Sequence, residues 1–492
     1  MHGLFRAKSD HPLADAKEAR RVLDSFVGME PVTALDEAAG WLESVCSGDR
    51  FKLEQRLALI RQLDEAVQAH ARRSARDYLT SPRLGRAQEM RLWQTNRGFW
   101  TQLGAAYEAC LDRYAAREKG ADDIKPQLPQ LVLRMLRAYS AQLKWNQFRY
   151  GPLSADLWRH LGKAYLAAEQ GRFAQRLLSA YPGAPAETSA EREYLKALVF
   201  HASSMGSLMP IEIELAERLI SHFLPHFTLT AEVRPDNVYW VDCAQAVPPT
   251  RLAKVPQRSP TLRFFNSGAA LPAVAALRKI IEGGEVPGDL NLGGQYPPRI
   301  VLPVLRHLEL YWAPKPPMRS HDRHRVKSRL AVVNGLARVH ARLDGRDYDE
   351  SEAWIAEDVS LGGMGAQVPL ANVDWIRVGS LLGLQPDGGD NWLVGVVRRF
   401  HRDTETLGTV GIETLAKAPR AIKANLGGMA CEALLLDALN GEEPVRVALP
   451  ARAFEADIAL EFALDARAVR LEPLALIESA TDFDIGRYRV AG

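Results

Sequence analysis

Residues 354–370 read WIAEDVSLGGMGAQVPL, two strand-like runs separated by a glycine-rich turn. Both runs have the length and the β-branched content that are typical of strands. Similar runs lie on either side of them, namely LAVVNGLARVHARL (330–343), GSLLGLQP (379–386), WLVGVVRRF (392–400) and GTVGIETL (408–415). Their lengths and the turns between them predict an antiparallel β-barrel over residues 330–416.

The strand pattern continues to the end of the chain. After residue 416 come AIKANL (421–426), VRVALP (445–450) and FDIGRYRV (483–490), again separated by Gly, Asp and Asn. We therefore predict a second β-unit over residues 417–492, packed on the first barrel.

Residues 1–225 have the opposite character. Apolar residues recur every three or four positions, as in the stripe Leu53, Leu57, Ile60, Leu63 and Val67. This period is typical of amphipathic helices, and Pro and Gly interrupt it at intervals. We predict an all-α helical array over this region, so that the fold class is multi-domain α + β.

One helix in this region carries a repeat-like spacing. Trp158, Leu161, Gly162 and Tyr165 fit the order W-x2-L-G-x2-Y and resemble one tetratricopeptide repeat. Ala174 falls where a second helix needs a small residue for close approach. No second copy matches, so a repeat array and an irregular helical bundle both stay open.

Two segments connect the helical array to the barrel. Residues 226–313 begin with strand-like runs and end in helical patterns, which predicts a strand-bearing insertion followed by closing helices. The prolines at positions 314, 316 and 317 then predict a linker over residues 314–329.

Composition excludes several classes of protein. The chain has 492 residues, of which 47% are hydrophobic and 25% charged, with a net charge of +2. This balance makes nucleic acid an improbable partner, and no stretch is long and apolar enough for membrane insertion. The four cysteines are widely spaced, so we expect no metal site and a cytoplasmic location. No catalytic motif is present, and we predict a protein that is not an enzyme and needs no cofactor.

The predicted linker is strongly basic. KPPMRSHDRHRVKSR (315–329) holds six Lys and Arg residues against a single Asp, a local net charge of +5. Guanidinium groups hold phosphate through paired hydrogen bonds and stack on flat bases, so this run suits a phosphate-bearing ligand. A solvated basic linker or a nonspecific nucleic-acid patch is the alternative.

A second motif lies between two predicted strands. Asp358, Ser360 and Gly363 form a DxSxxG spacing. A carboxylate can accept hydrogen bonds from a guanine edge, a hydroxyl can reach phosphate, and a glycine allows close backbone approach. The alternative is a turn in which Asp358 and Ser360 bond to their own backbone.

Together, an RxxxR element, a strand and DxSxxG some thirty residues later resemble the PilZ family of cyclic di-GMP receptors. The resemblance covers about residues 319–416. Two pairs fit RxxxR, Arg325 with Arg329 and Arg319 with Arg323, and we favour the first because Leu330 begins the expected strand directly after it.

The resemblance implies a bacterial signalling effector that binds cyclic di-GMP as its ligand. The arginines would contact phosphates and guanine O6 and N7, and the DxSxxG residues would hold the second guanine and the ligand backbone. Arg398 and Arg399 alternate along an expected strand, so at most one of them can face the ligand. Ligand binding would reorient the helical domain, through which we expect a protein partner to bind. The alternative function is a helical scaffold with a degenerate barrel that binds no nucleotide.

Overall fold

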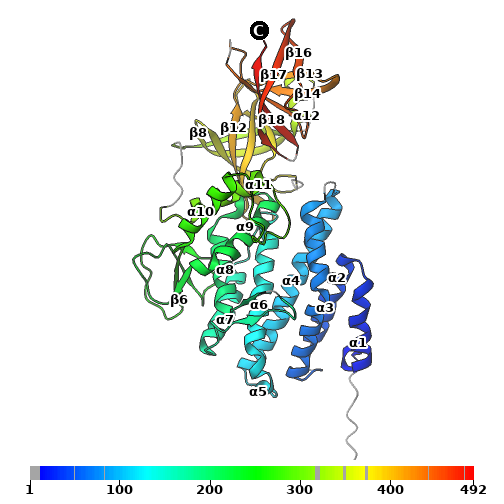
Figure 1. Ribbon diagram of the computed structural model, residues 1–492, viewed down its shortest axis with the longest axis vertical. Coiled ribbons are helices and arrows are strands. Elements are labelled where there is room, and N and C mark those ends of the chain that lie inside the picture. Colours follow the sequence, from blue (N-terminus) through cyan, green and yellow to red (C-terminus); the bar gives the residue numbers. More distant parts are fainter. Residues whose placement is uncertain are drawn as a thin grey trace, which may run out of the picture. The chain divides into compact units, whose positions relative to one another are not determined.

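The structure is a computed structural model that describes residues 11–48, 50–81, 84–184, 186–315, 322–346, 351–371, 375–440, 443–480 and 482–491. The chain forms two compact units. The helical unit comprises Met1–Phe148, Leu153–Met205 and Pro210–Pro317. The barrel unit comprises Arg149–Pro152, Gly206–Met209 and Met318–Gly492 (Figure 1). The predicted helical N-terminal region and C-terminal antiparallel β-barrel are both confirmed.

The helical unit contains helices that differ widely in length. They are α1 Ala16–Ser25, α2 Pro31–Cys46, α3 Leu53–Thr80, α4 Arg86–Ala115, α5 Ala121–Ile124, α6 Leu128–Gln147, α7 Asp156–Gln170, α8 Ala190–Ala202, α9 Pro210–Phe223, α10 Ala270–Glu282 and α11 Pro298–Trp312. Local sequence explains where the first of them begin. Asp15 accepts hydrogen bonds from two backbone N–H groups at the start of α1, and Pro31 occupies the first position of α2.

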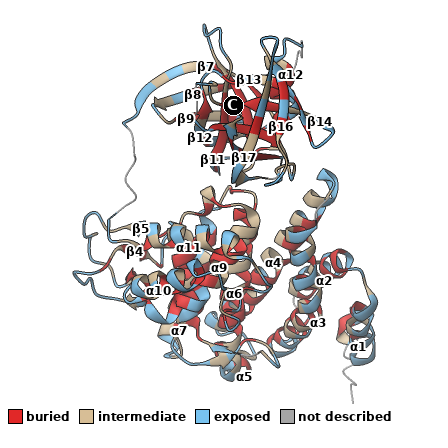
Figure 2. Ribbon diagram, turned by 45° about the horizontal axis from the view of Figure 1, so that its top comes forward, coloured by how far each residue is buried: buried red, intermediate tan, exposed pale blue. Residues whose placement is uncertain are grey.

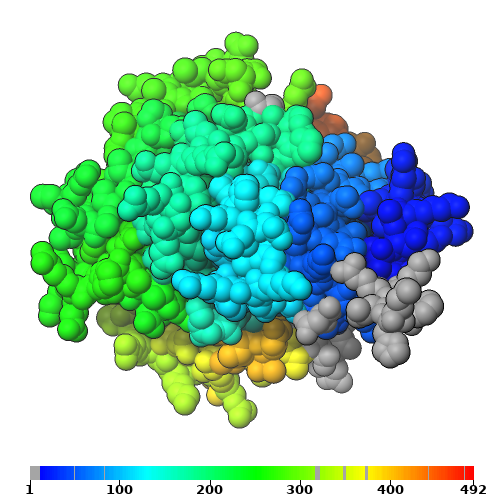
Figure 3. Space-filling view, turned by 90° about the horizontal axis from the view of Figure 1, so that it is seen from below, coloured from blue at the N-terminus to red at the C-terminus, as the bar shows by residue number. Residues whose placement is uncertain are grey.

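Most helices bury one face against their neighbours, and α6 is buried on nearly all sides (Figure 2). The predicted stripe of α3, from Leu53 to Val67, is buried along its whole length. Helices that follow one another in the sequence lie side by side, as the gradual change from blue to green in Figure 3 shows. Among the described residues, no helix is long and apolar enough to span a membrane.

A polar cluster fastens α4, α6 and α7 together. Glu108 accepts hydrogen bonds from the hydroxyl of Tyr139 and from Lys163 Nζ at 2.8 Å. His160 Nδ1 lies 2.7 Å from the same carboxylate. Burial alone would raise the pKa of Glu108, but the hydrogen bonds from His160, Lys163 and Tyr139 outweigh it and lower the pKa to about 2.

The tetratricopeptide-like segment is helical but does not form a repeat. Trp158, Leu161, Gly162 and Tyr165 are buried in α7, as a core-facing helix requires. A Cβ at Gly162 would lie 2.0 Å from the carbonyl oxygen of Cys243. This glycine therefore allows the backbone at Cys243, directly after a strand, to approach α7 closely, and it does not contact a second repeat helix. Ala174 is also outside any helix.

The segment that holds Ala174 connects α7 to α8. Its described residues form turns and two short strands, β1 Leu178–Ser179 and β2 Glu187–Thr188. Gly171, Pro182 and Gly183 interrupt the helical pattern there. The irregular bundle is therefore the better description of this unit.

The strands of the insertion form one antiparallel sheet. They are β3 Thr228–Thr230, β4 Tyr239–Asp242, β5 Thr250–Arg251 and β6 Leu262–Asn266, in the order β3-β6-β4-β5. Every residue of β6 is buried, which fits its central place and its aromatic sequence LRFFN.

The barrel unit contains two closed six-stranded barrels, so the expected second β-unit is itself a barrel. The strands of the first are β7 His324–Asn334, β8 Glu352–Ser360, β9 Gly363–Pro369, β10 Leu381–Pro386, β11 Leu393–Arg402 and β12 Leu407–Ala416. Those of the second are β13 Arg420–Leu426, β14 Met429–Leu435, β15 Val445–Pro450, β16 Leu460–Leu464, β17 Arg467–Ser479 and β18 Phe483–Val490. The orders are β10-β11-β12-β9-β8-β7 and β13-β14-β15-β18-β17-β16.

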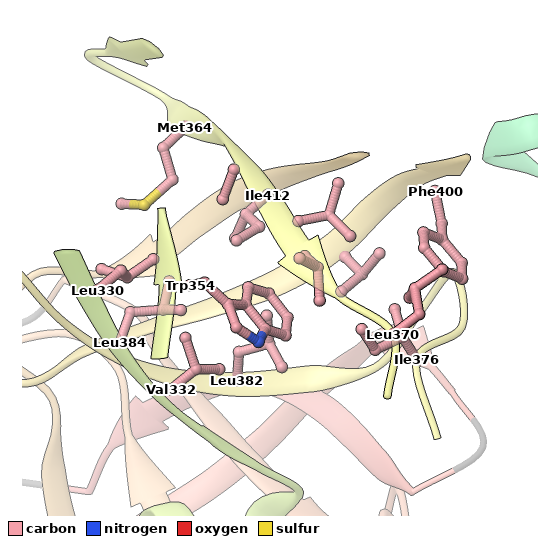
Figure 4. Close-up of a cluster of buried hydrophobic side chains, with 14 of the residues drawn as sticks. Leu330, Val332, Trp354, Met364, Leu370, Ile376, Leu382, Leu384, Phe400 and Ile412 are labelled. Carbon is pink, nitrogen blue, oxygen red and sulfur yellow. The ribbon is translucent and has the colours of Figure 1, made fainter. Parts of the chain in front are cut away.

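The first barrel is filled by alternating residues of its strands. Trp354 has no exposed surface and lies among aliphatic side chains from the surrounding strands (Figure 4). Met364, Ala366, Val410 and Ile412 point into the same core. Because successive strand residues face opposite sides, the residues between them point to the outer surface of the barrel.

The helix α12 Leu336–Leu343 joins the two barrels. Leu336 and Val339 belong to an apolar cluster that also contains residues of β11, β14 and β18. The buried ring of His340 lies 3.1 Å from the carbonyl oxygen of Ile422, through Nε2. Arg398 of the first barrel forms a bidentate ion pair with Glu478 of the second at 2.6 and 2.7 Å.

Two expectations about residues 314–343 are wrong. The strand β7 begins at His324 and not at Leu330, so residues 324–329 of the expected linker are strand. Its charged residues are stabilised by backbone pairing with β8, which the local sequence does not reveal. Residues 336–343 were expected to be strand and are helix α12, because Gly335 at φ +81° ends the extended run and buried residues then recur three and four apart.

Candidate ligand-binding site

The two sequence motifs meet across neighbouring strands. Arg325 of β7 lies directly opposite Asp358 of β8. A β-bulge between Arg325 and Ser328 adds one residue to β7, so that an advance of three residues along β7 corresponds to two residues along β8. Arg329, on the other side of the bulge, lies opposite Ile355. The strand pairing therefore brings the arginine run beside the DxSxxG motif.

The carboxylate of Asp358 is held from one side. Its Oδ1 accepts a hydrogen bond from the backbone N–H of Gly365 at 2.9 Å and forms an ion pair with Arg323. The Oδ2 atom has no hydrogen-bond partner among the described residues, and the side chain is 27% exposed. One oxygen is thus fixed while the other can accept from a ligand.

The arginines differ in what they contact. The guanidinium of Arg323 is engaged with Asp358. Arg325 and Arg329 are exposed, and within the described ranges no hydrogen bond or ion pair occupies their guanidinium groups. Arg319, the fourth arginine that the motifs suggested, lies outside the described residues. The exposed guanidinium groups of Arg325 and Arg329 therefore lie near the carboxylate of Asp358, whose charge Arg323 balances.

Ser360 and Gly363 close the turn between β8 and β9. The hydroxyl of Ser360 donates to the carbonyl oxygen of Gly363 at 3.1 Å. A Cβ at Gly363 would lie 2.0 Å from the carbonyl oxygen of Ile412, so the close approach of β12 requires a glycine here. The sequence had suggested that a ligand requires it. To bind phosphate, the Ser360 hydroxyl would have to turn away from its own backbone.

Arg398 and Arg399 also differ. Arg398 is bonded to Glu413 as well as to Glu478. Arg399 is exposed and opposite Gly411 of β12, and no described residue forms a hydrogen bond or an ion pair with its side chain. Sequence reasoning expected at most one of the two to face a ligand, and it could not choose between them without the bulge that separates Val397 from Arg399.

Two hollows of the described residues lie away from the candidate site, on the second barrel. One of them, of about 250 Å³, is lined by residues that include Asn425, Asp457 and Arg470. None of the candidate arginines or DxSxxG residues lines it.

One comparison with known proteins concerns a different part of the chain. No curated protein matches the sequence. Residues 17–235 match the family model described as "Cyclic-di-GMP receptor FimW, N-terminal domain", over a stretch that runs from α1 past β3 and contains none of the candidate site residues. Over less than half of its length, the chain is therefore similar to the N-terminal domain of a family of cyclic di-GMP receptors.

Proposed function

We propose that this protein is a cyclic di-GMP receptor whose first barrel is of PilZ type and binds the ligand on the outer face of β7, β8 and β9. The observation that carries the proposal is the placement of Arg325 opposite Asp358, with Arg329 exposed nearby. The similarity of residues 17–235 to a receptor domain for the same ligand supports it independently, because that stretch does not overlap the barrel motifs.

Each group has a chemical role in this proposal. The forks of Arg325 and Arg329 would hold phosphate oxygens and the guanine acceptors O6 and N7. The Oδ2 atom of Asp358 would accept from the N1–H and N2–H donors of a guanine. Arg323 keeps the carboxylate oriented, which lowers the cost of arranging it when the ligand arrives.

Titration calorimetry tests the proposal. Cyclic di-GMP should bind the full chain with a Kd of about 1 μM or lower, which corresponds to roughly −8 kcal/mol. Arg325→Ala, Arg329→Ala and Asp358→Ala should each weaken binding strongly, because each leaves a polar group of the ligand unpaired. Arg487→Ala removes an exposed arginine of the second barrel and should have no effect. Unchanged affinity in all three site variants would remove the assignment.

The function of a helical scaffold with a degenerate barrel remains the second candidate. The observation that favours it is the turn itself, in which Asp358 and Ser360 bond to backbone groups of their own hairpin. If the full chain releases no heat with cyclic di-GMP at low salt, and no other method detects binding, this candidate replaces the first.

We further propose that ligand binding reorients the helical unit relative to the barrel unit. The ligand-binding arginines follow directly on the proline-rich segment at 314–317, so the chain that contacts the ligand also connects the two units. Neutralising part of a +5 run by two phosphates favours an ordered arrangement. Small-angle scattering and protease cleavage between residues 319 and 329 should both change with ligand. Unchanged profiles at saturation would refute the reorientation and leave the binding site intact.

A further inference from the structure

A row of five residues crosses the outer face of the first barrel. Successive strand pairings align Arg325 of β7, Asp358 of β8, Gly365 of β9, Gly411 of β12 and Arg399 of β11. Adjacent strands lie about 4.8 Å apart, so the row extends over about 19 Å between the two arginine backbones. Its ends are cationic and its centre carries no side chain.

Both glycines face outward. Their neighbours Met364 and Ala366 in β9, and Val410 and Ile412 in β12, belong to the barrel core, and alternation places the residue between them on the opposite surface. Neither glycine has a backbone angle that disfavours other residues. The gap between Asp358 and Arg399 is therefore not dictated by the backbone conformation of the sheet.

The two glycines differ in what they accommodate. A Cβ at Gly365 would lie 2.9 Å from Asp358 Oδ1, so this glycine makes room for the carboxylate that the turn holds. A Cβ at Gly411 would lie 3.3 Å from the Cβ of Arg399, which is the closest atom and belongs to an exposed side chain. A larger residue at position 411 would require only small adjustments of the fold. It would, however, fill the gap on the surface.

Arg399 ends the row as a cation that the described residues leave without a partner. Its neighbour Arg398 is fully engaged with Glu413 and Glu478. The β-bulge between Val397 and Arg399 sets this difference, because it inserts Arg398 as the extra residue and turns Arg399 to the face that carries Asp358. A guanidinium in this position can close over the glycine gap.

We propose that Arg399 forms the far end of the ligand site and holds a phosphate of cyclic di-GMP, while a flat part of the ligand lies over Gly411. This inference rests on the proposed function and adds to it a residue from outside the two sequence motifs. In this arrangement positive groups lie at both ends of the ligand, and Gly411 leaves the space beside Arg399 free of a side chain.

Calorimetry on the full chain with cyclic di-GMP separates this inference from the function that it assumes. Arg399→Ala should weaken binding about tenfold or more, as the loss of a charge-assisted hydrogen bond requires. The affinity of Arg399→Lys should lie between those of the wild type and Arg399→Ala, because lysine keeps the charge but loses the paired hydrogen bonds of the guanidinium group. Gly411→Val should weaken binding several-fold by filling the gap, and its thermal midpoint should stay close to that of the wild type.

The controls are Arg487→Ala, which removes an exposed arginine elsewhere, and Arg325→Ala, which tests the motif site. If Arg325→Ala loses affinity while Arg399→Ala and Gly411→Val bind like the wild type, the inference is wrong and the receptor function stands. If Gly411→Val does not fold, the series of Arg399 variants decides alone. If the wild type does not bind cyclic di-GMP at all, the function and the inference are both overturned.

Discussion

Arginine replacements distinguish the two RxxxR pairs. Arg325→Ala and Arg323→Ala remove the same side chain at positions only two residues apart. They differ in what the side chain contacts, since Arg323 is paired with Asp358 and Arg325 is unpaired among the described residues. If ligand binding uses Arg325 and Arg329, the two replacements should have clearly different effects.

The expected magnitudes follow from those contacts. Arg323 and Asp358 are 31% and 27% exposed, and a partly exposed ion pair contributes about 0–1 kcal/mol. Arg323→Ala should therefore change the affinity by no more than about fivefold. A charge-assisted hydrogen bond to the ligand contributes about 1.5–3 kcal/mol, so Arg325→Ala should weaken binding by about 10- to 150-fold.

The assay is titration calorimetry at fixed ionic strength, with the thermal unfolding midpoint of every variant measured beside it. Both side chains are exposed or partly exposed, so neither replacement should lower the midpoint by more than a few degrees. Arg329→Ala should weaken binding about as strongly as Arg325→Ala, and Arg319→Ala should have as small an effect on the affinity as Arg323→Ala.

The opposite grouping would refute the reasoning. If Arg319→Ala and Arg323→Ala abolish binding while Arg325→Ala and Arg329→Ala leave it unchanged, the other arginine pair binds the ligand. The placement of Arg325 opposite Asp358 would then be a structural contact of the sheet, and the receptor function would remain.

Three further predictions concern other parts of the protein. Gly363→Ala should lower the free energy of unfolding by about 1–3 kcal/mol in urea titrations, because its methyl group would meet the Ile412 carbonyl; Gly411→Ala is the control, and equal losses would contradict the reasoning. The site should bind cyclic di-GMP more tightly than cyclic di-AMP, since adenine offers Asp358 no N1–H or N2–H donor; equal calorimetric affinities would indicate attraction to phosphate alone. The pKa of Glu108 is lowered to about 2 in the folded protein, so its contribution to stability is present above about pH 4.5 and is lost as the pH falls toward 2. Between these pH values the urea midpoint of the wild type should fall more steeply than that of Glu108→Gln, and parallel profiles would show that this carboxylate contributes nothing.

The local sequence predicted much of the fold because periodicity reports burial directly. The stripe from Leu53 to Val67 is buried in α3, and the strand-like run that begins at Trp354 lies in β8. Long-range pairing was not predictable in the same way. The run from His324 to Arg329 has the composition of a solvated linker and is strand only because β8 lies beside it.

The candidate site was predictable only in part for the same reason. The resemblance to a receptor family singled out Arg325 and Asp358 as residues of one site, but it did not show that they lie directly opposite each other. The contact between Asp358 and the backbone of Gly365, and the position of Arg399 in the same row, depend on β-bulges in three strand pairs. A bulge shifts every later residue of a strand to the other face, and one sequence alone does not show where it occurs.

The apolar cluster around α12 means that the two barrels share a buried interface in addition to their own cores. Val394 and Val396 of the first barrel pack with Leu434 and Phe483 of the second, and all four are almost completely buried. A fragment that ended at Ala416 would expose this surface to water and would be prone to aggregate. The two barrels should therefore unfold in one cooperative transition.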